Sequence, residues 1–163
     1  VAPDAIGEIK AAQAQGWNDV TWLLLSSVYT QQFANAVTHA GKGVYLPAEF
    51  TPYTDPNNAA TQDWRALMMK NKIPLTAFSE GGYLAATYFV DVLKGMKGDI
   101  TKESVTKALK SMQPISNPMS GSPYVFGPGK THNSNATGWP VKLLSGTQQW
   151  QSAAKDWLHV PAN

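Results

Sequence analysis

Helix-like and strand-like segments alternate in the N-terminal part of this 163-residue chain, and this alternation restricts the possible folds more than any other feature. Residues 4–15 have the pattern of a helix that ends at a glycine, and residues 20–25 form an apolar, β-rich run long enough for one buried strand. A second helical pattern leads to another strand-like run at residues 43–50. Because such alternation is typical of helices packed on a parallel sheet, we predict an α/β fold.

The remainder of the chain has weaker signals for regular structure. Residues 51–58 contain two prolines and are predicted to form a linker or crossover, and residues 59–71 have the pattern of a helix. A further helix is predicted at residues 102–112. Prolines, glycines and asparagines dominate from residue 113 to residue 140. The tail, residues 147–157, is predicted to be a weakly amphipathic helix.

Residues 78–89 are the most informative local stretch. An apolar run at residues 73–78 ends in a Ser-Glu-Gly-Gly turn, after which a helical pattern begins with Ser79 placed as its N-cap. Gly81 and Gly82 carry no side chain, so another group could approach the backbone closely, and the amides of a helix N-terminus favour an anion. The pattern alone is compatible with an ordinary capped core helix or with the edge of a binding site.

Composition excludes several classes of function. The net charge of +2, without a cluster of basic residues, gives no indication of nucleic-acid binding. The chain has no cysteine, and His39, His132 and His159 lack the short spacing of a zinc site, so no metal or other cofactor is predicted. No apolar run approaches the ~18 to 20 residues that span a bilayer. The chain begins at Val1 without an initiator Met or a signal sequence, so we expect that a signal peptide or longer segment was removed.

One catalytic alternative arises from residues 77–81, which differ by one residue from a Gly-x-Ser-x-Gly nucleophile elbow. Ser79 would be the nucleophile of a serine esterase-like hydrolase. Asp99 or Asp156 would be the acid, and His132 or His159 the base, in an order that hydrolases use. Glu80 argues against this reading, because it places a negative charge beside the amide of the oxyanion hole.

Several longer motifs resemble one family. They are FSEGGYLAA from residue 78, LKGM from residue 93, GDITKESVTKALKSM from residue 98, MSGSPYVFG from residue 119 and VKLL from residue 141. Together they are similar to the C-terminal half of the solute-binding proteins of branched-chain amino acid type ABC transporters, the bilobal Leu/Ile/Val-binding class. The resemblance implies a type I periplasmic-binding-protein-like fold with doubly wound, Rossmann-like lobes. A complete member is about twice this length, so the chain would be a C-terminal fragment.

The resemblance also implies a division into lobes and a ligand site. Residues 1–51 and 139–163 would belong to the second lobe, and residues 52–138, with helices and a hairpin, to the first. Pro52 and Pro140 would flank the hinge on which the lobes close. The expected ligand-binding residues are Ser26, Ser27 and Tyr29 from the second lobe, and Phe78, Ser79 and Glu80 from the first.

The implied ligand is a branched-chain or other apolar amino acid, or a small aromatic carboxylate. Amino-acid binders of this class pair the ligand's ammonium with an acid of the second lobe. At the matching place this sequence offers Ser26 and Ser27, and Glu80 could replace the acid only if it points into the cleft. Phe78 and Tyr29 would suit an apolar or aromatic ligand body. The two ligand classes therefore stay open.

The resemblance finally implies partners and a location. The protein would be periplasmic or otherwise extracytoplasmic, and its loaded form would dock onto the membrane permease of an ABC transporter; a ligand-sensing domain of the same fold is the alternative. We also expect apolar helix faces of residues 52–138 to lack a covering sheet, and hence pairing with the protein's own N-terminal half or self-association. These faces contain Trp64, Leu67, Met68, Leu84, Tyr88 and Val92.

Overall fold

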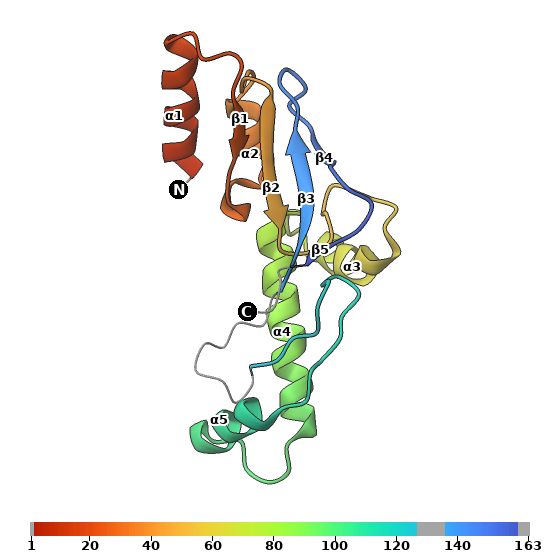
Figure 1. Cartoon of the computed structure of the whole chain (residues 1–163). Coiled ribbons are helices and arrows are strands. Elements are labelled where there is room, and N and C mark those ends of the chain that lie inside the picture. Colours follow the sequence, from red (N-terminus) through yellow and green to blue (C-terminus); the bar gives the residue numbers. More distant parts are fainter. Residues whose placement is uncertain (1, 127–135, 160–163) are drawn as a thin grey trace.

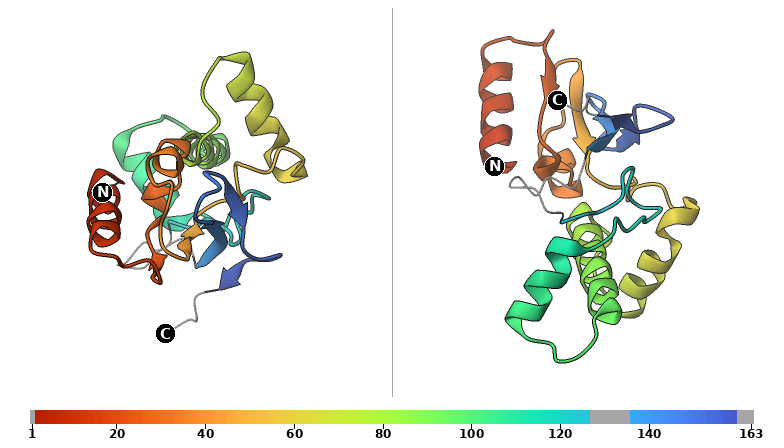
Figure 2. Two further views of the ribbon diagram at one scale, coloured as in Figure 1. Left: turned by 90° about the horizontal axis from the view of Figure 1, so that it is seen from above. Right: turned by 60° about the horizontal axis from the view of Figure 1, so that its bottom comes forward.

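The computed structural model describes residues 2–126 and 136–159. In chain order its elements are α1 (Ala2–Ala14), β1 (Thr21–Leu23), the 3-10 turn η1 (Ser26–Val28), α2 (Gln31–Ala36), β2 (Gly43–Ala48), the 3-10 turn η2 (Ala59–Thr61), α3 (Gln62–Lys70), α4 (Ala77–Gly95), α5 (Lys102–Ser111), β3 (Thr137–Leu143), β4 (Trp150–Ser152) and β5 (Leu158–His159). The strands lie with α1 and α2 at one end of the molecule, whereas α3, α4 and α5 lie at the other (Figure 1). Figure 2 shows the same separation from other directions.

The strands form one mixed sheet in the order β1-β2-β3-β4, with β5 paired to β3. β1 and β2 are parallel, and the chain connects them through η1 and α2, the kind of crossover that parallel strands need. β3 runs antiparallel to β2, and both β4 and β5 run antiparallel to β3. The predicted α/β class is therefore confirmed, although only the β1–β2 pair is parallel.

One face of the sheet carries the hydrophobic core. Leu46 of β2 pairs with Val141 of β3, and both side chains are at most 2% exposed. They belong to one buried cluster with Phe33 of α2 and Ile9 of α1. Burying each such side chain stabilises the fold by about 1.5–3 kcal/mol. From Val44 to Ala48 the more buried residues of β2 alternate with the less buried ones, as the two-residue period of a strand requires.

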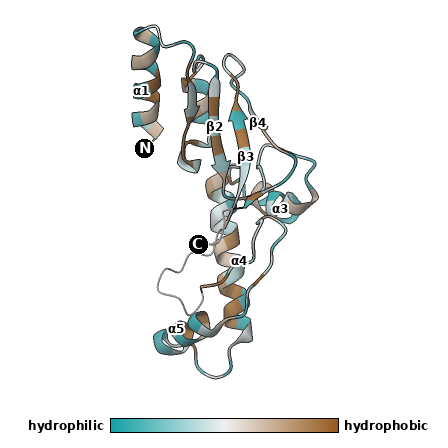
Figure 3. Ribbon diagram, in the orientation of Figure 1, coloured by the Kyte–Doolittle hydropathy of each residue, from teal (hydrophilic) through white to brown (hydrophobic). Residues whose placement is uncertain are grey.

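The opposite face of the sheet is apolar and open. Leu23 and Leu25 are 79% and 72% exposed, although residues 20–25 are predicted as a fully buried strand. Tyr45 of β2 pairs with Leu23, and Pro47 pairs with Pro140 of β3 on the same side. Figure 3 shows hydrophobic residues along β2 and β3. The prediction of a buried strand is wrong for Leu23 and Leu25, because no described element covers this face.

The long helix α4 begins earlier than predicted. Thr76 is its N-cap: its hydroxyl accepts a hydrogen bond from the amide of Ser79, while Ser79 Oγ accepts one from the amide of Thr76. This reciprocal capping box satisfies two amide donors, so the helix starts at Ala77. Ser79, the predicted N-cap, is instead the third residue of the helix, and Gly81 lies inside it rather than in a turn.

The helices at the far end of the molecule cover one another. Trp64 of α3 and Leu84 of α4 are 0% and 1% exposed, and Tyr88 stacks on Tyr124 of the following loop at 4.7 Å between ring centroids. Met119 of the same loop is also buried. The expectation that these faces are uncovered is wrong for Trp64, Met68, Leu84, Tyr88 and Val92, which are all buried, and right only for Leu67, which is 45% exposed.

The C-terminal tail forms strands rather than the predicted helix. Trp150 is buried in β4, pairs with Leu143, and donates its indole N–H to the carbonyl of Thr30 at 2.9 Å. Gly146 has a positive φ of 79° and turns the chain back onto β3. Pairing with β3 and the contact of Trp150 with Thr30 therefore override the weak helical periodicity of this segment, as tertiary contacts often override local propensity.

The chain crosses between the strands and helices α3 to α5 after β2 and before β3 (Figure 1). The predicted lobe boundary at residues 51–52 follows β2, whereas the one at residues 138–139 lies inside β3. Near this crossover the amide of Thr51 donates to the carbonyl of Met119 at 2.9 Å. Tyr124 bridges to Ile115, but much of the predicted hairpin lies outside the described residues. The division into lobes stays a prediction. No described helix has the length and apolar character needed to cross a membrane.

Candidate functional site

Five of the six predicted site residues line one cavity. Its volume is about 160 Å³. This is smaller than the ~300 Å³ at the lower end of pockets for drug-sized ligands, so it suits a small solute. We call it the crossover pocket, and it is lined by Ser26, Ser27, Tyr29, Ala48, Glu49, Phe50, Ala77, Phe78 and Glu80. Residues about fifty positions apart in the sequence thus meet in this pocket. Ser79 is the one predicted site residue that does not line it.

The two serines lie where β1 ends. The chain leaves the strand at Leu25 and makes the 3-10 turn η1, which places Ser26 and Ser27 at the carboxyl edge of the sheet. Ser26 Oγ donates a hydrogen bond to Glu49 Oε1 at 2.9 Å. Ser27 Oγ is buried and has no hydrogen-bond partner among the described residues. A buried hydroxyl without a partner is costly unless a ligand or water satisfies it.

Glu49 is the site residue that the sequence analysis missed. It follows β2 directly, and because β1 and β2 are parallel, their carboxyl ends meet at the same edge of the sheet. The side chain of Glu49 is exposed and lines the crossover pocket. The sequence signal that points to Glu49 is its place directly after the predicted strand at residues 43–50, where an acid would reach the carboxyl edge of a parallel sheet.

Glu80 contributes a second carboxyl group to the crossover pocket. It lies in the first turns of α4, is 1% exposed, and its Oε1 has no hydrogen-bond partner among the described residues. Burial raises the pKa of Glu80 from 4.5 to about 8, and the positive charge of Arg65 only partly opposes this rise. Glu80 is therefore mostly a neutral carboxylic acid at neutral pH, when the pocket holds no ligand.

Tyr29 forms the floor of the crossover pocket next to the crossover itself. Its ring packs against Tyr53 with 4.6 Å between centroids, and its hydroxyl lies 3.1 Å from Thr54 Oγ1. Burial raises the pKa of the Tyr29 hydroxyl, and burial raises that of Tyr53 to about 12. Both hydroxyls therefore stay protonated and are hydrogen-bonding groups rather than charges.

Phe78 and Phe50 supply apolar wall. Phe78 is 66% exposed in the first turn of α4, and Phe50, which follows Glu49 in the chain, also lines the crossover pocket. A Cβ atom added at Gly81 would lie 3.2 Å from Phe50 Cε2, so this glycine lets α4 approach the aromatic ring. An exposed aromatic beside a polar cavity is suited to covering the apolar part of a ligand.

Ser79 serves the helix rather than the crossover pocket. Its Oγ donates to the carbonyls of Pro74 and Thr76 at 2.8 and 2.9 Å, within the capping box. The regular helix at this position replaces the strand–turn–helix geometry that a nucleophile elbow requires, so the hydrolase reading of Ser79 is not supported. His132, one of its two candidate bases, lies outside the described residues. Among the described residues no group of histidines and acids could hold a metal ion.

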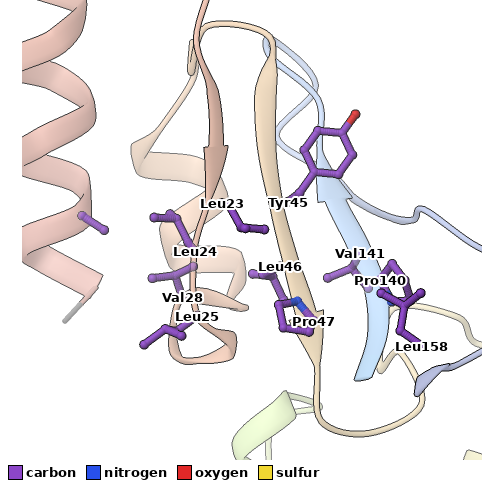
Figure 4. A pocket seen from close by; sticks show the side chains of 11 residues that line it. Leu23, Leu24, Leu25, Val28, Tyr45, Leu46, Pro47, Pro140, Val141 and Leu158 are labelled. Atoms are coloured by element: carbon purple, nitrogen blue, oxygen red, sulfur yellow. The ribbon is translucent and has the colours of Figure 1, made fainter. Parts of the chain in front are cut away.

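A second hollow lies on the open face of the sheet (Figure 4). It has a volume of about 680 Å³ and is lined almost entirely by apolar side chains, including Leu23, Leu25, Pro47 and Leu158. Ligand pockets usually combine an apolar wall with a few convergent polar groups. This hollow has an apolar wall but lacks convergent polar groups, so it is an uncovered sheet face rather than a candidate solute site.

Comparisons with known proteins agree with the α/β fold. A family model described as "Periplasmic binding protein" matches residues 1–148. The crystal structure of a possible leucine/isoleucine/valine-binding protein from Rhodopirellula baltica SH 1 matches with a TM-score of 0.76 and 22% sequence identity, over 92% of this chain and 40% of that one. At this identity the likeness concerns the fold, and the chain spans less than half of that protein's length. No curated protein matches the chain significantly.

Proposed function

Because this chain belongs to the periplasmic binding protein family, we propose that it forms the C-terminal part of a protein that captures a small solute in the crossover pocket. The observation that carries the proposal is the meeting of five predicted residues around one cavity. Polar groups converge there beside aromatic walls, which is the usual composition of a small-molecule site. Capture rather than catalysis follows from the family and from the use of Ser79 as a capping residue.

The proposed ligand is an amino acid with an apolar side chain. Glu49 supports this choice, because it is an acid that follows strand β2 in the segment assigned to the second lobe. In the Leu/Ile/Val-binding class that the sequence resembles, an acid of the second lobe binds the ligand's ammonium. Phe78 and Phe50 would cover the apolar side chain of the ligand. A small aromatic carboxylate is the second candidate, favoured by the same rings and by the neutral state of Glu80.

Closure of two lobes would hold the solute. Ser26, Ser27 and Glu49 come from the segment assigned to the second lobe, whereas Phe78 and Glu80 come from the segment assigned to the first. A rotation about the crossover near Pro52 and Pro140 would change the distance between these two groups. A solute that contacts both groups at once would then stabilise the closed arrangement of the two lobes.

The remaining parts of the proposal concern location and partners. We expect an extracytoplasmic protein, in the periplasm or attached to the membrane, whose loaded form docks onto an ABC permease. A receptor of the same fold that signals instead of delivering the solute is the alternative. Because the sheet face around Leu23 and Leu25 is apolar and exposed, we expect another polypeptide segment to pack on it, either the protein's own N-terminal half or a second copy.

Calorimetric titration tests the proposal. Leucine, isoleucine, valine, phenylalanine and benzoate are titrated into the protein, and thermal unfolding is followed in parallel. A bound solute at 100 times its Kd should raise the free energy of unfolding by about 2.7 kcal/mol. Saturable binding of at least one apolar amino acid is the expected result, and the absence of binding by all five would contradict the proposed ligand classes.

A further inference from the structure

The crossover pocket contains two carboxyl groups in opposite environments. Glu49 is exposed at its rim and accepts a hydrogen bond from Ser26. Glu80 lies at its depth, nine-tenths or more buried, with Oε1 unpartnered among the described residues. A buried carboxylate without a partner is strongly unfavourable, so Glu80 must be neutral or must receive a partner. In the pocket, the missing partner can only arrive with a ligand or water.

The groups packed around Glu80 do not supply a permanent counter-charge. Tyr29 and Tyr53 lie near Glu80 as neutral phenols, so neither carries a positive charge, and no described hydrogen bond joins either hydroxyl to Glu80. Arg65 of α3 is close enough to lower the pKa of Glu80, but its guanidinium donates to the carbonyls of Tyr53 and Asp55 and to Thr61 Oγ1. Among the described residues no ion pair joins Arg65 to Glu80.

We infer that capture of an amine-bearing solute in the crossover pocket is coupled to the release of a proton from Glu80. The inference rests on the proposed function. In the empty pocket Glu80 carries its acidic proton. When the ammonium group of a solute arrives, the O–H bond of Glu80 breaks, the proton leaves to solvent, and the carboxylate pairs with the ammonium. A solute without an amine is instead held by Glu80 as a neutral acid, which donates a hydrogen bond and keeps its proton.

The coupling predicts how affinity depends on pH. Because Glu80 must first be ionised, the affinity for an amine-bearing solute falls as pH falls below about 8, by up to tenfold for each pH unit. The affinity for the matched solute without the amine does not fall in this interval. Glu49, the other carboxyl group that lines the pocket, is exposed and bonded to Ser26, and the Glu49→Gln variant separates its part from that of Glu80.

Calorimetry in two buffers with different ionisation enthalpies tests the inference. Leucine and 4-methylpentanoate, which is leucine without its amine, are titrated into the protein at neutral pH in phosphate and in Tris. The dependence of the heat on the buffer gives the number of protons released. We expect close to one proton for leucine and none for 4-methylpentanoate. Glu80→Gln should abolish the proton release. The matched control Glu49→Gln should weaken leucine binding but should still release the proton.

The outcomes separate this inference from the proposed function. Leucine binding with the same heat in both buffers would overturn the proton coupling and leave solute capture intact. Retention of the release in Glu80→Gln would overturn the assignment to Glu80. Failure of both solutes to bind would contradict the proposed ligand class and the coupling with it. The wild-type comparison of buffers does not depend on any variant, so a poorly folded Glu80→Gln protein would not leave the question open.

Discussion

Ser26 and Glu49 join the carboxyl ends of the two parallel strands through a hydrogen bond of 2.9 Å from Ser26 Oγ to Glu49 Oε1. The two residues are 23 positions apart, and neither is buried. The bond orients an acid toward the crossover pocket from an edge of the sheet where ligands usually bind in α/β folds. The relationship makes Glu49 a candidate ligand-binding residue, with Ser26 as the group that positions it.

Removing the charge of Glu49 should therefore weaken the binding of amine-bearing solutes. Hydrogen bonds to charged groups contribute about 1.5–3 kcal/mol, so Glu49→Gln should raise the Kd for leucine by roughly 10- to 100-fold. Ser26→Ala should raise it less, by about tenfold or below, because it removes only a positioning bond. Titration calorimetry measures both. Glu49→Gln with wild-type affinity for leucine would remove Glu49 from the site.

Phe78 should matter for binding and not for folding. Its side chain is 66% exposed, so Phe78→Ala should leave the unliganded melting temperature within a few degrees while weakening solute binding strongly. Phe89→Ala is the matched control, because Phe89 is 45% exposed on the same helix and does not line the crossover pocket. Thermal unfolding with and without leucine distinguishes them. Equal ligand-induced stabilisation of both variants would contradict a binding role for Phe78.

Glu80 should make the folded state less stable as pH rises. Because burial raises the pKa of Glu80 from 4.5 to about 8, the folded protein holds a proton in this interval that the unfolded chain has lost. The associated stability is fully present below pH 4.5 and is lost as pH rises through 8. Urea unfolding at several pH values should show this decline in the wild type and a smaller one in Glu80→Gln. Parallel pH profiles of stability for the two proteins would contradict the assignment of this decline to Glu80.

Ser79 should contribute to stability alone. Loss of its capping hydroxyl should lower the free energy of unfolding by about 0.5–2 kcal/mol and leave solute affinity unchanged. Ser104→Ala is the control, since Ser104 occupies the same position of the capping box at the start of α5. Denaturant unfolding and leucine titration of both variants provide the comparison. A selective loss of binding in Ser79→Ala would return this residue to the ligand site.

The open sheet face should cause association of the 163-residue chain by itself. With Leu23 and Leu25 exposed, we expect light scattering after size-exclusion chromatography to give a mass above 17.6 kDa. Leu23→Lys should shift the mass toward the monomer, whereas Leu67→Lys, an exposed position on α3, should not. A stable monomer of the unsubstituted chain would show that this face needs no cover.

The sequence predicted the local order of elements well where hydrophobic period and caps agree. Residues 43–50 indicate the strand that became β2, and Thr101 caps α5. The tail around Trp150 was predicted incorrectly, because its strand depends on pairing with the preceding strand β3 and on the contact of Trp150 with Thr30, far away in the chain. Helical periodicity does not encode these tertiary contacts, and weak helical signals are overridden by them.

The candidate site was predicted largely through the resemblance and less through chemistry. Ser26, Phe78 and Glu80 were expected from the resemblance, and the structure brings them to one cavity. Glu49 was missed because an acid after a strand is common, and only the parallel register of β1 and β2 brings it next to Ser26. Burial of Glu80 could not be predicted, since it depends on the tertiary packing around the start of α4.

Residue-resolved NMR during a leucine titration tests the central claim most directly. If the crossover pocket binds the solute, the amide signals of residues 26–29, 49–50 and 77–80 should shift together and saturate at one Kd. Signals from the open sheet face, such as those of Leu23 and Tyr45, should stay in place. Saturable shifts confined to that face, or no saturable shift in the crossover pocket, would contradict the assignment of the solute site.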